Sequence, residues 1–135
     1  VENWTDNPVF YRIKSGEPQD IELSTGTEPG SELETKAILK IIDEIKPQSI
    51  ISFHSALDCI EDPNNTELGQ WIASETGIPL VDDVGYPTPG SFGTWAKENS
   101  IPLITFEVPL MPLTQMITDY VPTLIQLLRN NHLPV

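Results

Sequence analysis

A helical pattern that runs almost directly into a strand pattern constrains the fold of this chain more than any other feature. Residues 31–46 carry apolar side chains at helical spacing, namely Leu33, Ala37, Ile38, Ile41, Ile42 and Ile45. Ser31 and Glu34 have the spacing of a capping box, and Pro47 ends the helix. The next residues, 49–53, form a short apolar run typical of a strand buried in a parallel or mixed sheet. A connection this short favours an α/β fold.

The rest of the chain continues this alternation of strands and helices. We expect further strands at residues 9–13, 79–81 and 101–108, and further helices at residues 66–76 and 114–129. Pro122 is expected to kink the last helix or to reset its start. Segments rich in Gly, Pro and polar residues predict loops at 15–30, 58–65 and 85–93. The predicted fold is a mixed, mostly parallel sheet flanked by helices, in a single domain over residues 1–135.

The charge and the cysteine content exclude several classes of protein. The chain has 20 acidic and 7 basic residues, for a formal net charge of −13. Nucleic acids and anionic membrane surfaces both attract clustered Lys and Arg, so neither is an expected partner. No apolar run approaches the ~20 residues that span a bilayer. The single cysteine, Cys59, excludes an internal disulfide framework and fits the cytoplasm, where thiols stay reduced.

Three polar residues are candidates for chemistry because of the segments that carry them. His54 follows the strand at 49–53, and binding sites collect at the carboxyl ends of strands. Glu107 lies in an apolar strand, where a carboxylate is costly to bury unless it is paired or functional. Tyr86 lies on a loop from which its phenol can reach over a site. Each also has a plain structural reading: a hydrogen-bonded histidine, a glutamate at a sheet edge facing water, and a tyrosine that packs the loop onto the core.

For the remaining candidate residues, the sequence favours a structural role over a chemical one. An exposed acidic loop is the expectation for Asp58, Glu61 and Asp62, and a solvated turn for Asp82 and Asp83. Cys59 is expected to be a packed thiol, Trp95 to anchor its loop by packing, and His132 to be inert.

In this order and at these spacings, the segments resemble the zinc carboxypeptidase family, the carboxypeptidase A-like metallopeptidases. Residues 52–55 (SFHS) resemble the segment that carries the later zinc-binding histidine. Tyr86, with Trp95 nine residues on, resembles the tyrosine that closes over the substrate, with its loop. Residues 104–107 (ITFE) resemble the strand that carries the catalytic glutamate.

This resemblance implies a fold, a cofactor and a set of roles. The chain would form the C-terminal part of a catalytic domain that binds one zinc ion. His54 would be a zinc ligand, Glu107 the catalytic residue, and Tyr86, Ser55 and Gly93 substrate contacts. The family also holds its zinc with an earlier His-x-x-Glu pair, and no histidine precedes His54 here. We therefore expect little or no activity from this chain alone, and self-association through an exposed sheet edge.

The substrate expectation rests on four further segments, at residues 29–35, 59–63, 67–69 and 85–93. They resemble the branch of the family that cleaves murein peptides, although Leu33 stands where that branch usually has proline. The resemblance implies hydrolysis of the γ-D-glutamyl–meso-diaminopimelate bond of a murein tripeptide or a related small peptide, in the bacterial cytoplasm. The alternative is a non-catalytic α/β binding module, or a fragment that associates with a partner chain.

Overall fold

The computed structural model describes residues 9–12, 20–23, 26–86, 88 and 90–129. Its backbone forms two compact units, one made of Val1–Pro47 with Thr88–Trp95 and the other of Gln48–Pro87 with Ala96–Val135. In the first unit, β1 (Val9–Arg12) pairs antiparallel with β2 (Asp20–Leu23), and α1 (Leu33–Ile45) follows. The short helix α3 (Phe92–Glu98) spans the boundary between the two units.

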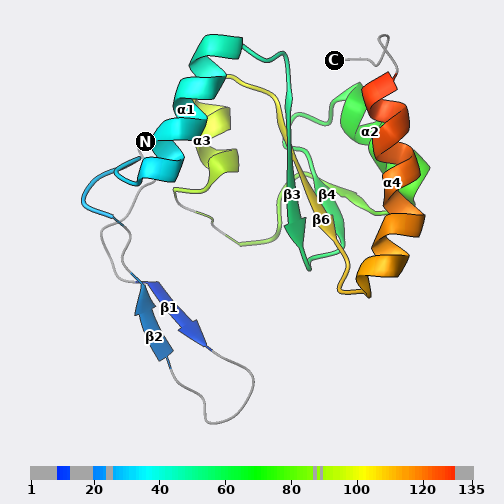
Figure 1. The fold of residues 1–135 in the computed structure, drawn as a ribbon, viewed down its shortest axis with the longest axis horizontal. Helices are drawn as coiled ribbons and strands as arrows, with labels where there is room; N and C mark the ends of the chain where they lie inside the picture. Colours follow the sequence, from blue (N-terminus) through cyan, green and yellow to red (C-terminus); the bar gives the residue numbers. More distant parts are fainter. Residues whose placement is uncertain (1–8, 13–19, 24–25, 87, 89, 130–135) are drawn as a thin grey trace. The chain divides into compact units, whose positions relative to one another are not determined.

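The second unit is built on a four-stranded sheet with the strand order β3-β6-β4-β5 (Figure 1). The strands are β3 (Ile50–Ser55), β6 (Leu103–Val108), β4 (Cys59–Glu61) and β5 (Leu80–Val81). β6 runs parallel to β3 and antiparallel to β4, and β4 runs parallel to β5. The predicted mixed, mostly parallel α/β sheet is therefore confirmed.

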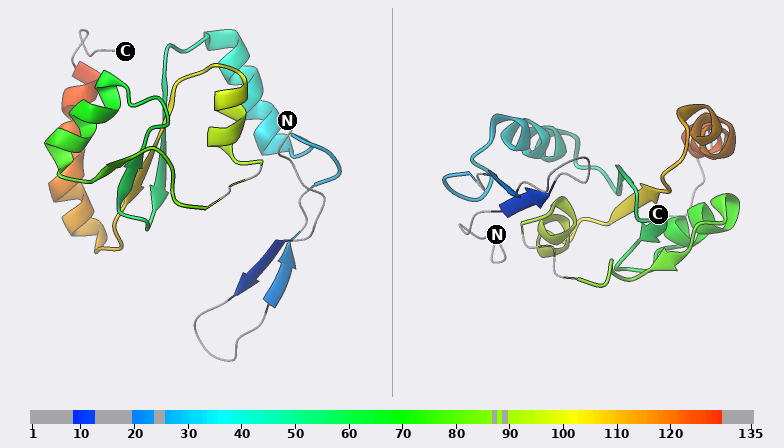
Figure 2. Two further views of the ribbon diagram at one scale, coloured as in Figure 1. Left: turned by 180° about the vertical axis from the view of Figure 1, so that it is seen from behind. Right: turned by 90° about the horizontal axis from the view of Figure 1, so that it is seen from below.

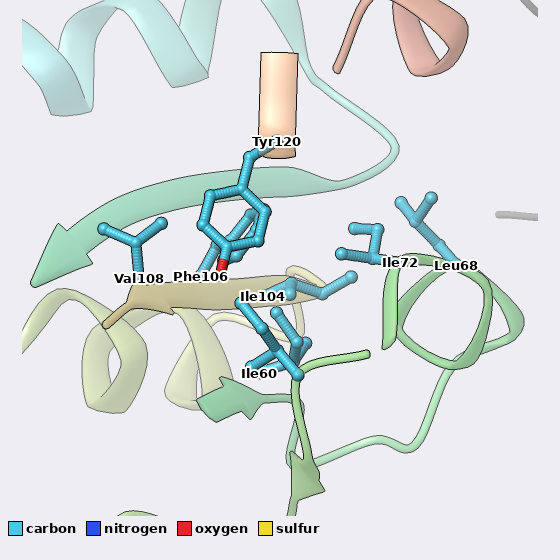
Figure 3. Packing of buried hydrophobic residues seen from close by; sticks show 8 residues of the cluster. Ile60, Leu68, Ile72, Ile104, Phe106, Val108 and Tyr120 are labelled. Carbon is cyan, nitrogen blue, oxygen red and sulfur yellow. The ribbon is translucent and has the colours of Figure 1, made fainter. Parts of the chain in front are cut away.

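One face of this sheet is covered by α2 (Glu67–Thr76) and α4 (Leu113–Arg129). The two helices lie together beside the sheet in both views of Figure 2. The core between them and the sheet consists of Ile60, Leu68, Ile72, Ile78, Ile104, Phe106, Val108 and Tyr120. Figure 3 shows the ring of Tyr120 against β6, next to Phe106 and Val108, with Ile104 further along β6 and Ile60 on the neighbouring strand β4. Since Ile104, Phe106 and Val108 alternate along β6, the residues between them belong to the other face.

Most predicted elements are present, and the differences are local. The sequence patterns correctly place three helices, α1, α2 and α4, and four strands, β1, β3, β5 and β6. Residue 13, the last of the predicted strand at 9–13, lies outside the described residues. Strands β2 and β4 and helix α3 lie wholly or partly in segments predicted to be loops. Pro122 does not reset the last helix, because α4 continues through it from Leu113 to Arg129.

The start of α1 differs from the capping-box prediction. The N-cap is Glu32, and its side chain makes no capping hydrogen bond. The Ser31 hydroxyl instead accepts a hydrogen bond from the Thr27 backbone N–H at 3.1 Å and donates one to the Glu32 carboxylate at 3.0 Å. Of the apolar stripe on α1, only Ile42 is buried, while Leu33, Ile38, Ile41 and Ile45 are exposed. Among the described helices, none combines the length and apolar character needed to cross a bilayer.

Candidate functional site

His54 and Glu107 are brought together by the pairing of β3 with β6. The two residues are direct partners in the parallel register, at the carboxyl ends of adjacent strands. Partners in register point to the same face of a sheet. That face is the one opposite the apolar core. The preceding pair, Phe53 and Phe106, has tilted rings with centroids 5.4 Å apart, and Phe106 also packs against Tyr120 in the core. A histidine and a carboxylate thus share one sheet face at the edge where α/β sheets bind ligands.

The His54 ring is held by a neighbour on its own strand. The Ser52 Oγ and the His54 Nε2 lie 2.9 Å apart, within hydrogen-bond distance. Residues two apart on a strand share a face, so the Ser-x-His spacing positions this contact. A histidine that binds a metal through one ring nitrogen commonly has its other nitrogen fixed by a hydrogen bond. Ser52 was not singled out from the sequence, although the spacing of two on a predicted strand is a signal for it.

Glu107 is buried, and one of its carboxylate oxygens has no partner. The residue is 8% exposed. Within the described part of the chain, its Oε2 is buried and makes no hydrogen bond. A buried carboxylate oxygen without a donor is energetically costly, and sites of this kind concentrate where function requires them. The alternative of a glutamate facing water at a sheet edge does not describe this residue, because β6 is an inner strand.

The other three predicted site residues have different surroundings. Ser55 ends β3 and is exposed. Tyr86 is 57% exposed, so it does not pack the loop onto the core. It follows Gly85, whose backbone N–H donates to the Asp83 carboxylate at 2.6 Å. Gly93 lies in the first turn of α3 and belongs to the other compact unit.

Cys59 extends the row formed by His54 and Glu107 onto a third strand. It is the antiparallel partner of Glu107 on β4, and its thiol is buried, as predicted. Burial raises the pKa of the Cys59 thiol above its ordinary value of 9.0, and the nearby charge of Glu107 raises that pKa further. The thiol therefore stays protonated at neutral pH.

Asp62 corrects the expectation of an exposed acidic loop. It is 1% exposed, and its carboxylate accepts hydrogen bonds from the backbone N–H groups of Asn64 and Thr66, at 3.1 and 2.7 Å. The Thr66 hydroxyl also donates to it at 2.7 Å, and the same hydroxyl oxygen caps α2 by accepting from the Gly69 N–H. The role of Asp62 is to shape the turn into α2. The Asp-x-x-x-Thr spacing before a helix is the signal for this role.

The donor set of this site fits a zinc ion only in part. His54 offers an imidazole nitrogen of the type that zinc binds, next to a carboxylate. Within the described residues, no group of three or more His, Cys, Asp or Glu side chains is close enough together to hold a metal ion. A zinc site that includes His54 therefore needs ligands from outside these residues.

The known proteins to which this chain is similar are murein peptide amidases. Murein peptide amidase A of Escherichia coli K12 is 43% identical over 128 residues, which cover 94% of this chain and 53% of that protein. The protein of the same name from Vibrio campbellii is 36% identical over 132 residues, or 97% of this chain and 53% of that protein. The crystal structure of murein-tripeptide amidase from Escherichia coli O157 matches with a TM-score of 0.86 and 41% identity, and the match covers 96% of this chain and 55% of that one. No protein-family model matches the chain.

These relatives are about twice as long as the region they share with this chain. The chain is similar to murein peptide amidases along nearly all of its own sequence, but spans only about half of theirs. The structural match supports the α/β fold independently of the sequence argument.

Proposed function

We propose that this chain is the part of a zinc-dependent murein peptide amidase that carries the general base and one zinc ligand. The observation that carries the proposal is the register pairing of His54 with Glu107 on one face of the sheet. Side chains on opposite faces would be incompatible with a shared reaction centre. The similarity to murein peptide amidases supports the choice of substrate class.

The proposed reaction is hydrolysis of the amide between γ-D-glutamate and meso-diaminopimelate in a murein tripeptide. The Glu107 carboxylate accepts a proton from the attacking water and passes it to the leaving amine of diaminopimelate. His54, held by Ser52, would offer its second ring nitrogen to the zinc ion. Zinc would act as a Lewis acid toward the scissile carbonyl. Tyr86 and Ser55 are both exposed and would contact the substrate.

A direct assay follows the product. A longer protein, in which this chain is joined to the remaining zinc ligands, is incubated with zinc and the murein tripeptide. Release of meso-diaminopimelate is measured by mass spectrometry. A matched peptide with an α-linked in place of the γ-linked glutamate is the control for the bond. Release from the γ-linked peptide alone supports the proposal, and equal release from both contradicts the assigned bond.

The single thiol supports a bacterial cytoplasmic location.

The 135-residue chain by itself is expected to be inactive, because His54 alone cannot replace three zinc ligands. Titration with zinc by calorimetry measures this directly. We expect no tight binding to the isolated chain, and tight binding with one zinc per chain would refute this part of the proposal. The alternative is a non-catalytic binding module. It would be favoured if the isolated chain and the longer protein both bind a murein peptide without zinc and do not hydrolyse it.

A further inference from the structure

The buried residue Cys59 is the neighbour of Glu107 across the sheet. Cys59 and Glu107 are direct partners on the antiparallel strands β4 and β6, and each is 8% exposed. Side chains of directly opposed residues lie on the same face, with Cβ atoms about 4.5–5.5 Å apart. Glu107 therefore has His54 on one flank and Cys59 on the other.

The two flanking residues differ in what they offer a carboxylate. A thiol is a weak hydrogen-bond donor and otherwise behaves as a small apolar group. The Glu107 Oε2 is buried and accepts no hydrogen bond from any described residue, Cys59 included. Both side chains are buried on this flank, and Cys59 offers the carboxylate no strong donor.

We propose that Cys59 is a positioning residue for Glu107, which packs against the base carboxylate without donating a strong hydrogen bond to it. This proposal rests on the assignment of Glu107 as the general base. A strong donor at position 59 would stabilise the carboxylate before the reaction and would weaken its attraction for the proton of the attacking water. A side chain without a donor leaves the proton affinity of the carboxylate undiminished.

The test compares two substitutions at position 59, made in a longer protein that joins this chain to the remaining zinc ligands and is called the full-length protein below. Cys59→Ser introduces a strong hydroxyl donor with little change of volume, and Cys59→Ala introduces no donor. We expect Cys59→Ser to lower kcat by about tenfold with an unchanged KM, because one hydrogen bond to a charged group corresponds to a factor of this order. Cys59→Ala should stay within about threefold of the parent kcat, because Oε2 remains without a donor.

Ile60→Val is the matched packing control. Ile60 is the next residue on β4, fully buried, and belongs to the core on the opposite face of the sheet. This variant should lower the melting temperature without changing kcat. If Cys59→Ser retains full kcat, or if the serine and alanine variants lose activity equally, Cys59 is only a packing residue and the proposal is overturned.

A spectroscopic measurement separates this proposal from the proposed function. Cys59 is the only cysteine of this chain, and its S–H stretching band in the infrared is assigned by its loss in Cys59→Ser. Glu107→Gln removes the charge beside the thiol and should shift the band, whereas Ile60→Val should not. An unchanged band in Glu107→Gln overturns the positioning role, whether or not the protein hydrolyses murein peptides. A shifted band in a protein without hydrolytic activity would instead support the contact between Cys59 and Glu107 and contradict the proposed murein peptide hydrolysis.

Discussion

Replacing Gly69 with alanine should destabilise this protein, although alanine is the better helix former. Gly69 lies in the first turn of α2, and a Cβ built on it would lie 2.2 Å from the Asp62 Oδ2. To restore an ordinary contact of 3.4 Å, the carboxylate has to withdraw by about 1.2 Å. Asp62 is 1% exposed, so its carboxylate cannot turn into solvent without opening the turn.

The cost follows from the hydrogen bonds that this withdrawal breaks. Oδ2 accepts from the Thr66 N–H and from the Thr66 hydroxyl, both at 2.7 Å. Each hydrogen bond to a charged group contributes about 1.5–3 kcal/mol, and the gain in helix propensity is at most about 1 kcal/mol. We therefore expect Gly69→Ala to lower the free energy of unfolding by about 2–5 kcal/mol.

Urea denaturation measures this loss, with Gly93→Ala as the matched control. Gly93 is also in the first turn of a helix, but the nearest atom to its added Cβ is the Ser91 Oγ at 3.8 Å, so the substitution should be neutral or slightly stabilising. Gly69→Ala should cost much less in an Asp62→Ala background, because the clash is then absent. A Gly69→Ala protein as stable as Gly93→Ala would refute this reasoning.

Three further outcomes are expected. Asp62→Ala should lower the free energy of unfolding by at least about 4 kcal/mol in urea denaturation, because three donors lose their buried acceptor. A loss no larger than that of an exposed acidic residue would contradict its assigned role. The free energy of unfolding should fall as pH rises above 9.0 and again above 10.0, because folding raises the pKa values of the Cys59 thiol and the Tyr120 phenol and the folded state therefore holds these protons more tightly. Urea denaturation of Cys59→Ala should lack the first decrease. A first decrease of unchanged size in this variant would exclude Cys59 as its source. Tyr86→Phe should lower kcat by about tenfold through loss of one hydrogen bond, with an unchanged melting temperature because Tyr86 is exposed; unchanged kinetics would remove Tyr86 from the site.

The sequence predicts elements well where the pattern is long and locally determined. α4 and β6 each carry a strong apolar period and were placed to within two residues. β4 was missed because it is three residues long and adjoins the acidic residues Asp58 and Asp62. Its extended conformation depends on pairing with β6 and β5, which no local pattern encodes.

The sequence proposes members of the candidate site but does not give their arrangement. His54 and Glu107 could be found from the strands that carry them, whereas their shared face depends on a register that only the sheet pairing sets. The burial of Asp62 was missed because local acidity indicates solvent exposure, and only the turn into α2 surrounds this carboxylate with donors. The capping box failed because the Ser31 hydroxyl bonds to Thr27 rather than to the helix.

The most direct test of the central claim is the rate of murein tripeptide hydrolysis by the full-length protein and by two variants of the paired residues, with zinc content measured on each sample. We expect Glu107→Gln to lower kcat by at least about a hundredfold while the protein keeps its zinc, because only the general base is lost. His54→Ala should lose both zinc and activity, because a metal ligand is lost. A Glu107→Gln protein with full activity, or a His54→Ala protein that retains zinc and activity, would contradict the account.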